Sequence, residues 1–97
     1  MKFITMYTRK ERTFAIVRHD GRYCAIEDKY IDADGKLTKT LNGLQMYASI
    51  SYDECVEHVK NTIDIDDMIA NGYTRAQALV KVYNLDPSMI EVLEKVI

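Results

Sequence analysis

The chain has 97 residues, of which 47% are hydrophobic and 29% are charged, and its formal net charge is −2. This length and balance are typical of one globular domain and exclude a disordered chain. No apolar stretch is long enough to cross a bilayer, the first residues lack a signal-peptide pattern, and two cysteines are too few for a secreted disulfide framework. We therefore expect a soluble, cytoplasmic protein with a single domain over residues 1–97.

Residues 1–50 are predicted to be mainly strands. The segments 2–8, 13–18 and 23–27 are rich in β-branched and aromatic residues. Asp20-Gly21 separates the last two of these segments and suits a type I′ turn, which needs two positive φ angles. The sequence therefore predicts a hairpin here.

Two further turn signals, Asp32–Gly35 and Asn42-Gly43, delimit additional short strands at 29–31, 36–40 and 44–50. In the last segment, apolar and polar residues alternate, which predicts that one face is buried. The residues expected on that face are Leu44, Met46, Ala48 and Ile50. The first half thus predicts an antiparallel β-meander of four to five strands.

Residues 51–97 are predicted to be mainly helices. Ser51 with Glu54 forms a capping-box pattern, and an apolar stripe follows at helical spacing. Asn71-Gly72 indicates a helix end, Thr74 a second helix start, and Asp86 before proline a third. The stripe of the first helix consists of Cys55, Val56, Val59 and Ile63. The predicted fold class is α+β, with three helices packed on the sheet.

The segment from Met68 to Leu79, together with the apolar helix 89–93, resembles a ubiquitin-associated three-helix domain. In that family a loop with methionine, glycine and an aromatic residue joins the first two helices, and here Asn71 stands in place of the methionine. The resemblance covers about the last third of the chain. It implies the packing of three short helices, and we do not extend it to ubiquitin binding.

Several motifs that carry chemistry are excluded. Asp32-Ala33-Asp34-Gly35 matches the centre of an EF-hand loop, but Tyr30 and Leu41 occupy the positions of its first and last ligands, so we expect a solvated turn. The four glycines do not form a phosphate-binding loop. We expect neither a cofactor nor catalytic residues.

The histidines and cysteines permit one alternative, a zinc site. Cys55 and His58 share a helix face, and His19 and Cys24 are diagonal neighbours in the predicted hairpin. Neither pair has the Cys-x2-4-Cys spacing usual for zinc. A Cys55–His58 pair would also be inert on a buried stripe. We therefore expect no metal.

The charge is unevenly distributed along the chain. Residues 1–49 carry nine basic residues against six acidic ones, whereas residues 50–97 carry four against nine. Arginines beside aromatic residues on a sheet are typical of a binding surface. The candidate binding residues are Arg9, Lys10, Arg12, Arg18, Arg22, Tyr7, Tyr23 and Tyr30. We predict a non-catalytic protein that binds another protein as an inhibitor or adaptor, and the alternative is a nucleic-acid-binding protein that uses the same basic hairpins.

Overall fold

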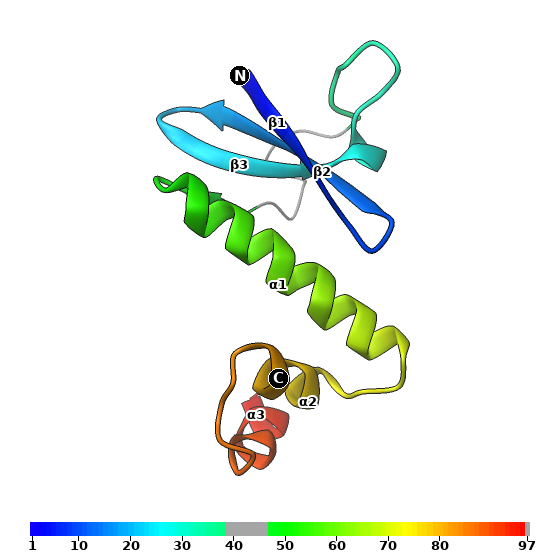
Figure 1. Ribbon diagram of the computed structural model, residues 1–97, viewed down its shortest axis with the longest axis vertical. Helices are drawn as coiled ribbons and strands as arrows, with labels where there is room; N and C mark the ends of the chain where they lie inside the picture. Colours follow the sequence, from blue (N-terminus) through cyan, green and yellow to red (C-terminus); the bar gives the residue numbers. More distant parts are fainter. Residues whose placement is uncertain (39–46, 97) are drawn as a thin grey trace. The chain divides into compact units, whose positions relative to one another are not determined.

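The computed structural model describes residues 1–38 and 47–96, and the chain forms two compact units, Met1–Lys60 and Asn61–Ile97. In the described residues, a four-stranded antiparallel sheet precedes three helices, which confirms the α+β class (Figure 1). The expectation of a single domain over residues 1–97 stays a prediction.

The sheet has the order β1-β2-β3-β4. Its strands are β1 (Lys2–Arg9), β2 (Arg12–His19), β3 (Arg22–Glu27) and β4 (Ala48–Ser49). The turn between β2 and β3 has φ angles of 51° at Asp20 and 74° at Gly21, so the predicted Asp-Gly hairpin is confirmed. The turn between β1 and β2 has the same character, with φ angles of 49° at Lys10 and 67° at Glu11.

The register divides the side chains of β2 and β3 between two faces of the sheet. Val17 pairs with Cys24 and Ala15 with Ile26, and these four buried residues form a cluster on one face. Ile16 pairs with Ala25 on the other face, and both are buried. Each fully buried isoleucine stabilises the fold by about 1.5–3 kcal/mol relative to an exposed one. Both faces of the central hairpin are thus core.

Helix α1 (Tyr52–Ala70) begins in the first unit and meets the sheet on the Ile16 side. The rings of Tyr52 and Tyr23 lie edge to face at 5.7 Å, and the Ser49 hydroxyl donates to Glu54 at 2.8 Å. The backbone N–H of Glu54 donates to Ser51, as the capping pattern predicts, although the Glu54 carboxylate turns to Ser49 instead of closing the box. Cys55 and Val59 of the predicted stripe are buried.

The second unit consists of the end of α1, α2 (Arg75–Val82) and α3 (Met89–Val96). The C-terminal end of α1 is capped by Gly72, whose φ angle is 98°. The N–H of Tyr73 donates a hydrogen bond to the Met68 carbonyl in the last turn of the helix. Thr74 caps α2 in a full capping box with Gln77. Asp86 accepts a hydrogen bond from the N–H of Ser88 before α3 begins. The three predicted helices and their local end signals are therefore confirmed.

Two local predictions differ from the structure. Segment 28–30 is a 3₁₀ turn, η1 (Asp28–Tyr30), and the strands expected around it reduce to a single bridge between Ile31 and Leu37. The prediction that Ala48 and Ile50 are buried is wrong: both are exposed, and Ser49 is the buried residue of β4. The Ser49 hydroxyl is accommodated because Glu54 and the Ser51 N–H satisfy it. The predicted positions Lys39, Thr40, Leu44 and Met46, and the Asn42-Gly43 turn, lie outside the described residues.

Candidate functional site

Two of the predicted binding residues, Arg18 and Tyr23, contact each other on the face that α1 meets. The Arg18 guanidinium donates to the Tyr23 hydroxyl at 2.9 Å and lies 5.0 Å from the centre of its ring. Tyr23 also packs against Tyr52 of the helix. Both side chains therefore contribute contacts within the first unit, and stacking of a partner on the Tyr23 ring would have to accommodate these contacts.

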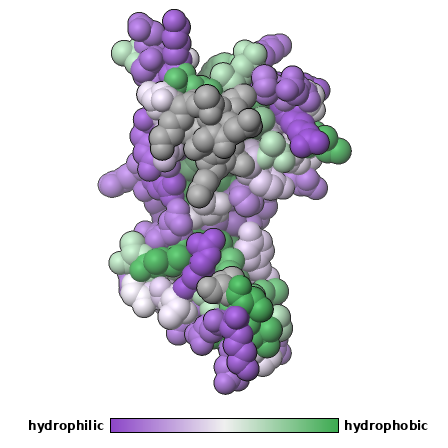
Figure 2. Space-filling model, turned by 180° about the vertical axis from the view of Figure 1, so that it is seen from behind, coloured by the Kyte–Doolittle hydropathy of each residue, from purple (hydrophilic) through white to green (hydrophobic). Residues whose placement is uncertain are grey.

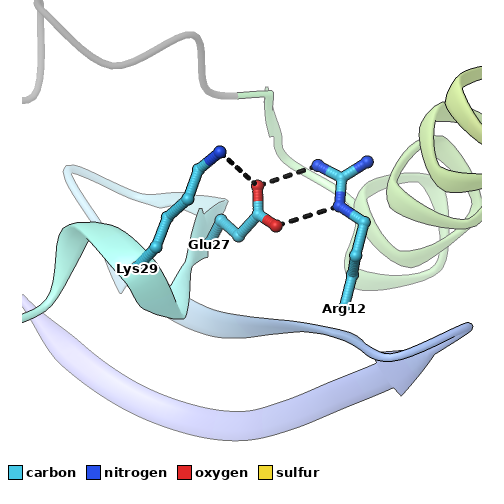
Figure 3. Close-up of polar contacts among 3 residues, drawn as sticks. All are labelled: Arg12, Glu27 and Lys29. Atoms are coloured by element: carbon cyan, nitrogen blue, oxygen red, sulfur yellow. Dashed lines mark hydrogen bonds and ion pairs between the residues drawn. The ribbon is translucent and has the colours of Figure 1, made fainter.

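Arg12 of β2 forms a bidentate ion pair with Glu27 of the neighbouring strand β3 (Figure 3). Its Nε and Nη2 atoms donate to the two carboxylate oxygens at 2.9 and 2.8 Å, and the Lys29 ammonium lies 3.7 Å from the same carboxylate. These hydrogen bonds from Arg12 are the main reason that the pKa of Glu27 is lowered. The Arg12 guanidinium is held in place by its structural contacts.

The other predicted binding residues are spread over the sheet and its turns. Tyr7 pairs with Phe14 on the face of Arg12 and Arg18. Arg22 pairs with His19 on the opposite face. Tyr30 packs against the Val17 cluster in the 3₁₀ turn, with the Lys29 ammonium 5.2 Å from its ring centre. The remaining two, Arg9 and Lys10, lie at the turn between β1 and β2. The register thus brings Tyr7, Arg9, Arg12, Arg18 and Tyr23 to one face and separates Arg22 and Tyr30 from them.

The four histidine and cysteine residues are also divided by the sheet. Cys24 shares the face of Val17, whereas α1, which carries Cys55 and His58, meets the sheet through Tyr23 on the other face. The His58 ring stacks on Tyr47 at 3.8 Å, and its pKa is lowered by burial. Among the described residues, no group of three or more histidine, cysteine or acidic side chains is arranged to hold a metal ion.

Burial also raises the pKa of both cysteine thiols. Cys55 is 0% exposed, and burial, with a smaller contribution from Cys24, raises its pKa to about 11. The pKa of Cys24 is raised mainly by burial as well. Because only the thiolate is a strong nucleophile, neither cysteine is prepared for covalent catalysis at neutral pH.

The turn Asp32–Gly35, which matches the centre of an EF-hand loop in sequence, is organised by its own first residue. The Asp32 carboxylate accepts hydrogen bonds from the N–H groups of Asp34 and Lys36.

An apolar pocket lies along β1 on the face of Val17, and sequence reasoning did not find it. Its volume is about 460 Å³, within the range of binding pockets. Its floor is formed by Ala15, Val17 and Ile26 of the central strands. The wall from β1 consists of Met1, Phe3 and Met6, and the opposite wall of Asp28, Ile31, Gly35 and Leu37.

A bulge in β1 creates this wall. Phe3 pairs with Val17 and Met6 with Ala15, although an odd and an even position of a regular strand would point to opposite faces. The register shifts between Phe3 and Thr5, and this extra residue returns Met6 to the face of Phe3. In the sequence, the pocket is indicated only by the run of large apolar residues at the start of β1. The bulge has no recognisable sequence pattern.

A second group of exposed apolar side chains lies in the second unit, in the lower part of Figure 2. Met89, Val92 and Val96 lie along one side of α3, at spacings of three and four residues. Tyr83 and Leu85, in the connection before it, are also exposed.

No protein-family model, no curated protein and no solved structure matches this chain. No helix among the described residues is both long and apolar enough to span a membrane.

Proposed function

We propose that this chain is a non-catalytic, cytoplasmic protein that binds another protein through the apolar pocket beside β1. The observation that supports this most is the exposure of large apolar side chains around one pocket. Phe3 is 58% and Met6 46% exposed, and Met1 and Ile4 of the same segment are exposed too. Folded proteins usually protect an edge strand of this kind, and an apolar patch beside a pocket is typical of a binding surface.

The chemistry of the site favours binding over catalysis. Among the described lining residues, the one ionisable side chain is that of Asp28, which is exposed, and none is a cysteine, histidine, serine or lysine. The buried thiol of Cys55, with its pKa of about 11, is on the other side of the sheet. Two buried free thiols also suit a reducing compartment such as the cytoplasm.

The nucleic-acid alternative receives less support from the basic residues. Arg12 is paired with Glu27, and Arg18 contacts Tyr23, so two of the five predicted phosphate-binding side chains contribute to the fold. Arg22 is exposed at the end of the β2–β3 hairpin, and it is the best single residue with which to test this alternative.

Affinity capture with matched variants tests the proposal. The immobilised wild-type chain, Phe3→Glu and Val92→Glu are exposed to lysate of the native cell at low and moderate salt, after nuclease treatment. Both substitutions place a carboxylate at an exposed apolar position, but only Phe3 lines the pocket. We expect a specific protein that the wild type and Val92→Glu retain at both salt concentrations and that Phe3→Glu loses.

Two results would overturn the proposal. The first is a partner whose capture is unchanged by Phe3→Glu in a variant with a native circular dichroism spectrum. The second is recovery of nucleic acid alone from lysate that is not nuclease-treated, with a steep loss at moderate salt and on Arg22→Ala, since phosphate contacts are weakened by counterions.

A further inference from the structure

The apolar pocket beside β1 has a polar end. Its floor includes Ala15, which pairs with Met6 on one side and with Ile26 on the other. The next pair on the same face of β1 and β2 is Thr8 with Thr13, because alternate residues of a strand point to the same side. The hydroxyl oxygens of Thr8 and Thr13 lie 3.0 Å apart, and hydroxyl oxygens so paired can still accept a further hydrogen bond. The apolar floor thus borders a pair of hydroxyl groups.

Asp28 adds a carboxylate to this end of the pocket. Glu27, the last residue of β3, pairs with Phe14, so Asp28 follows at about the level of Thr13. Asp28 lines the pocket and is exposed. Within residues 1–38 and 47–96, no side chain forms a hydrogen bond or an ion pair with the Asp28 carboxylate. This carboxylate is therefore available to a partner.

The basic residues of the sheet do not neutralise Asp28. The register puts Arg9, Arg12 and Arg18 on the face opposite the pocket. The Lys29 ammonium lies 3.7 Å from the carboxylate of Glu27, which belongs to that opposite face as well. The charged side chain that the described lining presents is thus an acid, although the first half of the chain is basic. A positively charged group in the partner complements it.

The shape of the pocket indicates what accompanies this positive charge. The small Ala15 lies between the larger Met6 and Ile26 in its row, which leaves space above the floor. The volume of about 460 Å³ is in the range of pockets that enclose drug-sized groups. The unbranched methionine side chains of the β1 wall can adapt to the group that enters. Bulky apolar side chains therefore suit the floor.

We propose that the pocket accepts a peptide segment of a partner protein that places bulky apolar side chains over Ala15 and Val17 and a lysine or arginine at the Asp28 end. The cation pairs with the Asp28 carboxylate and donates to the threonine hydroxyls. This inference rests on the proposed protein-binding function and specifies the chemistry of the partner.

The experiment first selects peptides from a displayed library of random twelve-residue sequences against the full chain. We expect enrichment of sequences that combine bulky apolar residues with a lysine or arginine. The most enriched peptide is then synthesised together with a version in which glutamine replaces this basic residue. Both peptides are titrated against the wild type and Asp28→Asn.

The four titrations form a double-mutant cycle. Removal of either charge is expected to weaken binding by about fivefold, the effect of a partly exposed ion pair. Removal of both should weaken it little further, because the two charges are each other's partners. Asp28→Glu, which keeps the charge, should bind the peptide within about twofold of the wild type. The matched control is Asp34→Asn, since Asp34 is an exposed acid beside Gly35 that is not a lining residue, and it should change binding by less than about twofold.

Apolar variants locate the peptide in the pocket. Phe3→Ser is expected to weaken peptide binding by about threefold or more, because Phe3 is part of the pocket wall. Val92→Glu, at an exposed apolar position of α3, should change it by less than about twofold.

Four outcomes overturn the inference: no enriched sequence, enrichment of sequences without lysine or arginine, additive effects of the two charge removals, or an equal loss of binding in Asp34→Asn. The proposed function is judged separately, by capture of the cellular partner. If that partner depends on Phe3 and is retained unchanged by Asp28→Asn, the inference fails while the proposed function stands. If the cellular partner does not depend on Phe3, the proposed function itself fails.

Discussion

Arg12 and Glu27, the first residue of β2 and the last residue of β3, are joined by two hydrogen bonds of 2.9 and 2.8 Å. The Glu27 side chain is 13% exposed and the Arg12 side chain 29% exposed. The pair closes the end of the β2–β3 hairpin, where Phe14 lies opposite Glu27 in the register. An ion pair with this geometry and partial burial contributes more than a fully exposed one.

This pair predicts a dependence of stability on pH. The hydrogen bonds from Arg12 lower the pKa of Glu27 in the folded state, so the stabilisation is fully present above the ordinary glutamate pKa of about 4.3 and is lost as pH falls through the lower folded value. Glu27→Gln should reduce the free energy of unfolding by about 1–2 kcal/mol at pH 7.

Urea unfolding at pH 7 and at progressively lower pH measures this effect. The difference between wild type and Glu27→Gln should shrink below pH about 4. Lys29→Ala is the control, because the Lys29 side chain is 61% exposed and lies 3.7 Å from the Glu27 carboxylate, and it should change stability by less than about 0.5 kcal/mol. A difference that persists unchanged in acid would contradict the prediction.

The thiol of Cys55 should be unreactive in the folded protein. It is fully buried and its pKa is raised to about 11, so less than about 0.1% is thiolate at pH 7. Labelling with iodoacetamide at pH 7 should be slow for both cysteines and become fast in denaturant. Rapid modification of Cys55 under native conditions, identified by peptide mass spectrometry, would show that its surroundings are not those of the structure.

The turn between β1 and β2 should be improved by substitution. Lys10 and Glu11 both have positive φ angles, which are costly for residues with long side chains, whereas Asn-Gly adopts them readily. The double change Lys10→Asn with Glu11→Gly should raise the free energy of unfolding by about 1 kcal/mol. The matched control is Asp20→Asn, where Asp-Gly already satisfies the turn, and it should alter stability by less than about 0.5 kcal/mol. A loss of stability in the double variant would contradict the turn geometry.

Gly72 is required for its backbone conformation and not for space. Its φ angle is 98°, and a Cβ at this position would meet no atom within 4 Å. Gly72→Ala should therefore cost about 1–2 kcal/mol of unfolding free energy through backbone strain alone. Asn84→Gly is the reciprocal control, because the φ angle of Asn84 is 53° and glycine would relieve its strain, with a gain of up to about 1 kcal/mol. Thermal unfolding of both variants checks the opposite signs.

The sequence by itself determined the features that depend on neighbouring residues. Asp20-Gly21 specifies its turn because glycine allows the positive φ angle, and Thr74 specifies the start of α2 because its hydroxyl reaches the N–H of Gln77 three residues later. The Asn71-Gly72 helix end and the Asp86 cap have the same local origin. These interactions form within one turn of the chain, so their residues can be found in the sequence alone.

Only the tertiary structure decided the register and its consequences. The β1 bulge that unites Phe3 and Met6, the pairing of Arg12 with Glu27, and the burial of Ser49 against Glu54 all depend on which residues lie opposite one another. A shift of one residue in strand register reverses every side chain between the two faces. Periodicity reports the apolar positions but not the extra residue of a bulge, and it therefore could not reveal the pocket on which the proposed function rests.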